Sequence, residues 1–224
     1  MSPVDRSTAR RLAKEALAAG EPLAWFERLY ALADGQAAAI PWADLAPNPH
    51  LAAWMERQPR DRSLGRVLVV GCGLGDDAEA LARRADRVVA FDVSATAVAW
   101  CLQRFSRSTV RYVVADVLTP PAEWRAAFDL VVEVYTLQVL PPELRRQAAQ
   151  AMAAAVAPGG RLLAVARGRS AQDPLGEMPW PLLPEELSNA FSPPLMRCSF
   201  EDFLDQESPP VRRLRAEFQG QPSA

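Results

Sequence analysis

The sequence predicts an α/β fold in which a mostly parallel, doubly wound sheet of seven strands carries helices on both faces and a helical N-terminal cap. Four consecutive apolar residues at 67–70, three of them valine, are typical of a strand buried on both faces. A glycine-rich turn follows at 71–75, and an alanine- and leucine-rich segment then predicts a helix. Short apolar runs and helical segments alternate up to residue 167, which indicates parallel strands joined by helices.

The first 57 residues predict a helical cap or lid, and residues 58–224 predict the core, within what we expect to be one structural domain. Gly20 and Gly35 divide the cap, because glycine commonly follows the end of a helix. The expected cap helices are 5–19, 21–32 and 50–57. Apolar side chains share one side of the second helix at helical spacing; they are Leu23, Phe26, Leu29 and Tyr30.

The core elements follow from their apolar runs and the breaks between them. Strands are expected at 66–70, 87–91, 110–114, 128–132 and 160–167, with helices at 76–84, 94–105, 121–127 and 142–155. A loop broken by proline and glycine at 168–183 leads to a short helix at 184–191. Apolar and polar residues alternate in 195–204 and 211–218, which predicts a closing pair of strands, one of them antiparallel.

The glycine-rich turn predicts a nucleotide site, because glycine lets backbone approach a ligand and the start of a helix presents unpaired N–H groups. Its glycines fall as G-x-G-x-G, and Asp76 stands where a dinucleotide fingerprint has its third glycine. The Gly-Lys-Ser/Thr ending of a phosphate-binding loop is absent from the sequence. The acidic pair Asp76 and Asp77 would also repel a pyrophosphate, so the pattern argues against NAD and ATP.

Acidic residues end or follow the next strands of the predicted sheet. Asp92 ends the second strand, where a carboxylate can accept both hydroxyls of a ribose. Asp116 ends the third strand, and Glu133 follows the fourth. A carboxylate at a strand end can instead cap the helix that follows, so both interpretations stay open for each of these acids.

Five segments in order and spacing resemble the class I S-adenosylmethionine-dependent methyltransferases, over residues 66–167. They are the glycine loop 71–75, Asp92, the Ala-Asp pair 115–116, the Phe-Asp-Leu-Val-Val stretch 128–132 and the Pro-Gly-Gly turn 158–160. The resemblance implies a Rossmann-like fold and S-adenosyl-L-methionine as the cofactor. The Asn/Asp-Pro-Pro-Tyr/Phe box of adenine and cytosine amino methyltransferases is replaced here by Glu-Val-Tyr-Thr at 133–136, which disfavours base methylation.

The resemblance also implies which residues contact the cofactor. Backbone of the glycine loop would lie against its methionyl part, and Asp92 would hold the ribose hydroxyls. Asp116 would accept from the adenine amine, Val117 would pack on the ring, and Glu133 would lie beside the transferable methyl group. The full expected set is Trp42, Gly71, Cys72, Gly73, Gly75, Asp92, Val93, Asp116, Val117 and Glu133.

Candidate catalytic and substrate-binding residues lie mostly outside these motifs. Glu133 and Tyr135 are the candidate catalytic residues. Aromatic and polar side chains of the cap and the late loops are expected to line an apolar pocket over the cofactor; they are Tyr30, Trp42, His50, Tyr135, Gln138 and Trp180. The Pro-Trp pair at 41–42 is similar to one in thiopurine, thiol and halide methyltransferases, although the sequence around it departs from their pattern.

Composition excludes several classes of function. The net charge of −2 argues against a nucleic-acid partner, since phosphate contacts need a basic face. A single histidine excludes a metal site built on imidazoles, and three widely spaced cysteines make a disulfide framework improbable. The N-terminus has no apolar leader segment and no apolar run is long enough to cross a membrane. We therefore expect a cytoplasmic monomer or homodimer that acts on a small molecule without a metal.

The expected function is methyl transfer from S-adenosylmethionine to a small-molecule nucleophile, with a thiol favoured over a phenol or an amine. Such in-line displacement needs proximity and exclusion of water more than acid–base groups. Two alternatives remain at this point: an NAD-dependent oxidoreductase, and a non-catalytic partner subunit that binds the cofactor. Protein and RNA acceptors are second choices, because the chain is acidic overall.

Overall fold

The computed structural model describes residues 6–222 and confirms the predicted fold class. Its sheet has seven strands in the order β3-β2-β1-β4-β5-β7-β6. All pairings from β3 to β5 are parallel, and β7 runs antiparallel to both of its neighbours. The strands are β1 (Arg66–Val70), β2 (Arg87–Asp92), β3 (Arg111–Val114), β4 (Phe128–Val134), β5 (Val156–Arg167), β6 (Met196–Leu204) and β7 (Arg212–Gln219). Residue 5, where we expected the first helix to begin, and residues 223–224 lie outside the described residues.

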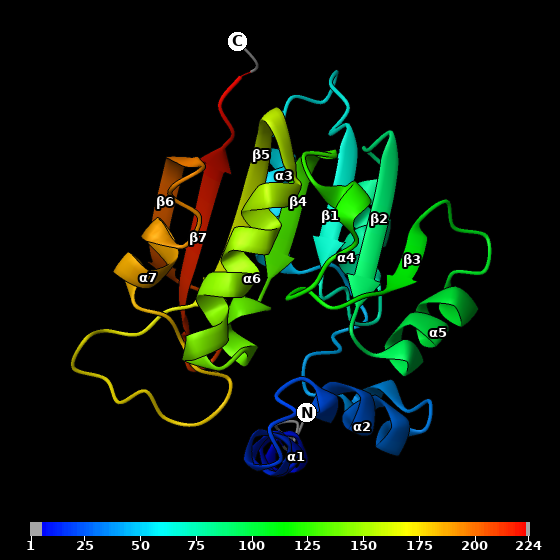
Figure 1. The fold of residues 1–224 in the computed structure, drawn as a ribbon, viewed down its shortest axis with the longest axis vertical. Coiled ribbons are helices and arrows are strands. Elements are labelled where there is room, and N and C mark those ends of the chain that lie inside the picture. Colours follow the sequence, from blue (N-terminus) through cyan, green and yellow to red (C-terminus); the bar gives the residue numbers. More distant parts are fainter. Residues whose placement is uncertain (1–5, 223–224) are drawn as a thin grey trace.

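Helices cover both faces of this sheet and its carboxyl-terminal edge (Figure 1). They are α1 (Ser7–Ala18), α2 (Ala24–Ala33), α3 (Pro49–Glu56), α4 (Asp76–Ala82), α5 (Ala95–Arg104), α6 (Pro142–Ala155) and α7 (Pro184–Asn189). Short 3-10 turns occur at η1 (Ala37–Ala39), η2 (Ala122–Trp124) and η3 (Leu137–Val139). One buried cluster joins α3, α4 and α5 to the sheet, and a second joins α6 and α7 to its opposite face.

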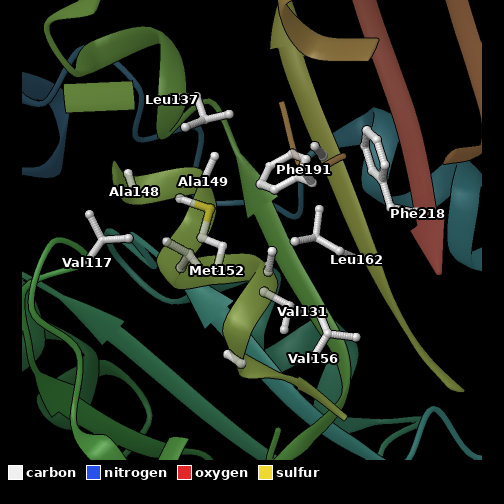
Figure 2. Close-up of a cluster of buried hydrophobic side chains, with 14 of the residues drawn as sticks. Val117, Val131, Leu137, Ala148, Ala149, Met152, Val156, Leu162, Phe191 and Phe218 are labelled. Atoms are coloured by element: carbon white, nitrogen blue, oxygen red, sulfur yellow. The ribbon is translucent and has the colours of Figure 1, made fainter. Parts of the chain in front are cut away.

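The core on the α6 side is built from side chains that alternate toward one face of neighbouring strands. Figure 2 shows Met152 of α6 beside Val131 of β4 and Leu162 of β5. Phe191 packs edge-on against Phe218 of β7, with ring centroids 5.0 Å apart. Burial of these apolar surfaces fixes α6 against the sheet and so fixes the loop between β4 and α6, which reaches the carboxyl-terminal edge.

The packing divides the expected cap of residues 1–57 into two parts. Leu51 and Trp54 of α3 are buried with Val69 of β1, so α3 packs on the face of the sheet. The side chain of Asn48 starts this helix by accepting the N–H groups of His50 and Leu51. Helices α1 and α2 instead share a third cluster and lie across the carboxyl ends of the parallel strands (Figure 1).

Strand β5 is longer than the predicted 160–167, because it includes the Pro-Gly-Gly segment that we expected to be only a turn. Val156 pairs with Phe128, and Arg161 pairs with Leu130, so two residues of β4 are matched by five of β5. Gly159 has a φ of +73°, which lets the extra residues bulge outward without strain. The expected helix at 121–127 is reduced to η2, which ends where Arg125 turns extended.

The fold makes a direct prediction for Met152, which is 2% exposed in the core on the α6 side. We expect Met152→Ala to lower the free energy of unfolding by about 2–5 kcal/mol, since it removes buried apolar contacts and leaves a cavity. Met196 on β6 is 67% exposed, and Met196→Ala should change the same quantity by less than about 0.5 kcal/mol. Urea denaturation of both variants tests this, and equal effects would contradict the packing of α6.

Candidate functional site

A cavity of about 1040 Å³ lies at the carboxyl ends of the parallel strands, under α1 and α2. Its walls come from the glycine loop after β1, the ends of β2, β4 and β5, the segment after β3, and the cap. Several apolar side chains line it, among them Leu23, Phe26, Val117, Val139, Leu140 and Met178. Its size and mixed lining suit a small-molecule site, and parallel α/β sheets bind ligands at this edge.

Glycine is required where the loop after β1 meets the cavity. Gly71 has a φ of +60°, and a Cβ built on it would lie 2.7 Å from Oγ1 of Thr136. Gly73 has a φ of +54°, and its Cβ would lie 3.4 Å from the hydroxyl of Tyr30. The backbone of Gly73 is therefore the floor beneath Tyr30 and Trp42, and a larger residue would enter the space between floor and cap.

Asp92 ties the glycine loop to the end of β2. One carboxylate oxygen accepts the N–H of Gly73 at 3.0 Å, and the other accepts the N–H of Ser94 at 3.0 Å. Burial raises the pKa of Asp92 to about 6, against these hydrogen bonds, which lower it. Each carboxylate oxygen has a second lone pair, so Asp92 can still accept from a ligand in the cavity that it lines. Val93 lines the cavity beside it.

The acidic pair after the glycine loop is less repulsive than the sequence suggests. Arg104 forms a two-pronged ion pair with Asp76, with an N–O distance of 2.8 Å. Asp77 accepts the N–H of Asn48 at 2.6 Å, and burial raises its pKa to about 6. One of the two negative charges is thus balanced, so this repulsion is a weaker argument against an anionic ligand than we expected.

Tyr30 and Trp42 form the aromatic roof over the glycine loop. The indole N–H of Trp42 donates to the hydroxyl of Tyr30 at 2.9 Å, and the two rings meet edge to face with centroids 6.1 Å apart. Phe26 also packs edge to face against Trp42, with ring centroids 6.4 Å apart. These rings fill the gap between the cap and Gly73, which limits the access of water to the cavity beneath them.

Tyr135, His50 and Gln138 line the cavity wall near the ends of β4 and β5. Tyr135 has a φ of +64°, which is unusual for a bulky residue and turns the chain sharply after β4. Burial raises the pKa of Tyr135 and lowers that of His50, so both are neutral at pH 7. Gln138 accepts the backbone N–H of Arg167 at 2.6 Å and thereby fixes the end of β5.

Three predicted site residues, Glu133, Asp116 and Trp180, are not among the residues that line the cavity. The carboxyl of Glu133 is fully buried and accepts the N–H groups of Thr136 and Leu137, so it holds the turn after β4. Asp116 accepts the N–H of Leu118. In the structure both carboxyls bond backbone N–H groups, and the contacts with ligand that we expected from the sequence stay predictions. Met178 and Pro179 line the cavity near the place where we expected Trp180.

Several lining residues were missed by sequence reasoning. Arg6 and Arg10 of the cap, Arg167 at the end of β5 and Arg213 on β7 bring positive charge to the cavity. Arg167 could have been found from the sequence, because it is a charged residue that directly follows the apolar run 162–166. No local pattern could reveal Arg213, because the antiparallel pairing of β7 with β5 places it beside Arg167.

Comparison with known proteins finds methyltransferases among the sequence relatives of this chain. A family profile described as a methyltransferase domain matches residues 67–160. A probable thiol methyltransferase 2 of Arabidopsis thaliana is 34% identical over 133 residues, which are 57% of each chain. A thiopurine S-methyltransferase of Vibrio campbellii is 27% identical over 183 residues, covering 74% of this chain and 82% of that protein. The chain spans only about half the length of the first relatives, at 57% and 49%.

Solved structures share the fold. N-methyltransferase NodS from Bradyrhizobium japonicum, in complex with S-adenosyl-L-homocysteine, superposes with a TM-score of 0.68 at 24% identity, over 86% of this chain and 98% of that one. A second structure concerns the conversion of a disulfide bond into a thioacetal group during echinomycin biosynthesis. It superposes with a TM-score of 0.72 at 21% identity, over 90% of this chain and 93% of that one.

No helix within residues 6–222 combines the length and the apolar character needed to cross a bilayer. No group of three or more His, Cys, Asp or Glu side chains there is arranged to hold a metal ion.

The burial of Glu133 predicts a specific pH dependence of stability. Burial raises the pKa of its carboxyl to about 8, and one of its oxygens has no hydrogen-bond partner among the described residues. In the unfolded chain a glutamate titrates near 4.3, so between these values the folded state holds one more proton. The free energy of unfolding therefore falls as pH rises through this window.

Glu133→Gln should remove this contribution, because an amide cannot ionise and its oxygen can accept the same two N–H groups. Urea denaturation at pH 5 to 8 measures how the free energy of unfolding changes with pH. The slope of this change should be more negative for the wild type than for the variant, by up to about 1.4 kcal/mol per pH unit. The exposed Glu123 provides the control, since Glu123→Gln should leave the wild-type slope unchanged. Equal slopes for wild type and Glu133→Gln would show that the carboxyl is ionised throughout.

Proposed function

The chain belongs to the class I S-adenosylmethionine-dependent methyltransferases, and we propose that it methylates a small-molecule nucleophile, in the first place a thiol. The observation that carries this proposal is the cavity that the glycine loop, Asp92 and the aromatic roof line together. A displacement at a methyl group requires a space that holds two reactants side by side and limits the access of water.

The residues present fit the cofactor of this class. The part of the cavity along the glycine loop would accommodate the methionyl part, and the acids near this loop suit its ammonium and sulfonium charges. Asp92 would accept from the ribose hydroxyls, and Ala115 and Val117 would pack on the adenine ring. When bound, the cofactor supplies an activated methyl group and a stable leaving group, S-adenosylhomocysteine.

The chain's own residues would orient the acceptor and keep the site dry. Tyr30 and Trp42 close the cavity above the loop, and Tyr135 stands where β4 ends. Tyr135 keeps its proton at pH 7, because burial raises its pKa, so we assign it an orienting hydrogen bond and not the role of a base. His50 is neutral and lines the cavity, which makes it the candidate acceptor for a substrate proton.

A thiol is the favoured acceptor because it reacts as thiolate and needs the least help from the protein. Its proton would leave to water or to a ring nitrogen of His50, and the cavity wall would hold the resulting thiolate in line with the methyl group that the bound cofactor would supply. Among the similar proteins are a probable thiol methyltransferase, a thiocyanate methyltransferase and a thiopurine S-methyltransferase. Phenols and amines rank next, since a basic group must remove their proton.

The first test is calorimetric titration with S-adenosylmethionine, S-adenosylhomocysteine and NAD, followed by a screen of thiols, phenols and amines. We expect the protein to bind the first two ligands and not NAD. With a thiol as acceptor, we expect S-adenosylhomocysteine to form. Binding of NAD alone would overturn the proposal in favour of an oxidoreductase. Cofactor binding with no transfer to any acceptor class would identify a non-catalytic binding subunit.

A matched pair of glycine substitutions tests the position of the cofactor. Gly73→Ala places a methyl group in the cavity floor, whereas Gly159→Ala, at a φ of +73° in the β5 bulge, meets no atom within 4 Å. Both variants should lose about 1–2 kcal/mol of stability from the left-handed backbone. Only Gly73→Ala should weaken the binding of S-adenosylhomocysteine, by at least about tenfold, which corresponds to 1.4 kcal/mol. Unchanged affinity in Gly73→Ala would place the cofactor elsewhere.

A further inference from the structure

The cavity has two ends of opposite charge. The end at the glycine loop carries acidic side chains; they are Asp44, Asp76, Asp77 and Asp92. The end at the carboxyl termini of β4 and β5 carries arginines; they are Arg6, Arg10, Arg167 and Arg213, with Glu207 as the acid among them. The positive charges of the proposed cofactor would be balanced by the acidic side chains. The proposed reaction gives no role yet to the arginines.

Two of these arginines have partners within the protein. Arg213 is buried and pairs with Asp205 at 2.6 Å and with Glu207. Arg10 pairs with Glu177 at 3.3 Å and donates to the carbonyl of Met178 at 3.0 Å. Their charges are balanced locally, so these two side chains shape the wall of the cavity without demanding a ligand.

Arg167 differs from both. Within residues 6–222 its guanidinium makes no hydrogen bond or ion pair, although the side chain is half-buried in the cavity wall. Burial lowers the pKa of Arg167, and the charges of Arg6 and Arg213 lower it further. Glu207 lies near enough to oppose this effect, but its carboxylate is already bonded to Arg213. A half-buried cation beside two like charges is stabilised when an anion enters.

The backbone holds Arg167 in this position. Its N–H donates to Oε1 of Gln138, and the next residue, Gly168, donates its N–H to the carbonyl of Arg212 on β7. Tyr135 lies on the same side of the cavity, with the guanidinium of Arg213 5.1 Å from its ring centroid. The unpartnered guanidinium therefore lies where β4 and β5 end, near Tyr135 and Arg213.

We propose that the methyl acceptor carries a carboxylate, and that Arg167 binds this carboxylate while the nucleophilic atom lies toward the glycine loop. The planar guanidinium fork matches a carboxylate in two parallel hydrogen bonds. Apolar side chains between the two ends, such as Phe26 and Val139, suit a hydrocarbon or aromatic body that joins carboxylate and nucleophile. This inference rests on the proposed function and narrows its acceptor to an anionic one.

The test uses two product-like probes of equal shape, 4-(methylthio)benzoate and its neutral amide, titrated by calorimetry with and without S-adenosylhomocysteine. The wild-type protein should bind the carboxylate about 10-fold to 100-fold tighter than the amide, the range of a hydrogen bond to a charged group. Arg167→Gln should abolish this preference, and Arg167→Lys should keep a part of it. Arg107→Gln removes an exposed arginine outside the cavity and should leave the preference unchanged.

Equal affinity for the two probes in the wild-type protein would overturn the inference, as would a preference that persists in Arg167→Gln. A protein that binds the carboxylate through Arg167 but does not bind S-adenosylhomocysteine would instead overturn the proposed function. The thermal midpoint of each variant shows whether it is folded. Retained binding of S-adenosylhomocysteine by Arg167→Gln separates a lost anion site from a general loss of structure.

Discussion

The site depends on one buried carboxylate, that of Asp92, which joins parts of the chain that the sheet alone would leave apart. It accepts the N–H of Gly73 in the loop after β1 and the N–H of Ser94 at the start of α5. Ser94 in turn caps α5 by accepting the N–H of Ala97, and it donates its hydroxyl proton to Glu27 of α2 at 2.7 Å. Floor, wall and roof of the cavity thus meet in a short chain of hydrogen bonds.

This arrangement has an electrostatic consequence. Burying a carboxylate costs free energy unless it is hydrogen-bonded. The pKa of Asp92 stays above its usual value, so its backbone hydrogen bonds compensate only part of this cost. A ligand that donates hydroxyl groups or carries positive charge relieves the remainder. The protein therefore holds an acceptor ready at the acidic end of the cavity, as it holds an unpartnered donor, Arg167, at the basic end.

The features that the sequence could predict are those encoded by short segments. The apolar run at 67–70 and the glycine loop specify β1 and the turn above it, because pattern and backbone conformation act over a few residues. The lining positions Gly71, Gly73 and Asp92 follow from local patterns of this kind, whereas Val117 was expected only from the family resemblance. The packing of α3 could not be read in this way, since its apolar face can meet either the cap or the sheet.

Local sequence patterns also could not predict the direction in which a side chain at a strand end points. Glu133 and Tyr135 are neighbours in the same turn, yet Glu133 points into the protein and bonds backbone, whereas Tyr135 lines the cavity. The positive φ of Tyr135 decides this difference, and no residue type at that position signals it. Arg213 depends on the pairing of β7 with β5, which joins residues far apart in the chain.

The cap contacts the core at both ends of the cavity, through a different helix at each. Helix α2 reaches the end near Asp92, where Glu27 accepts from Ser94 and from the hydroxyl of Thr96. Helix α1 reaches the opposite side, where Arg10 bonds the carbonyl of Met178. The two helices pack on each other through a shared apolar cluster, so a displacement of the pair as a unit breaks contacts at both ends. One packed unit, the α1–α2 pair, therefore covers both ends of the cavity.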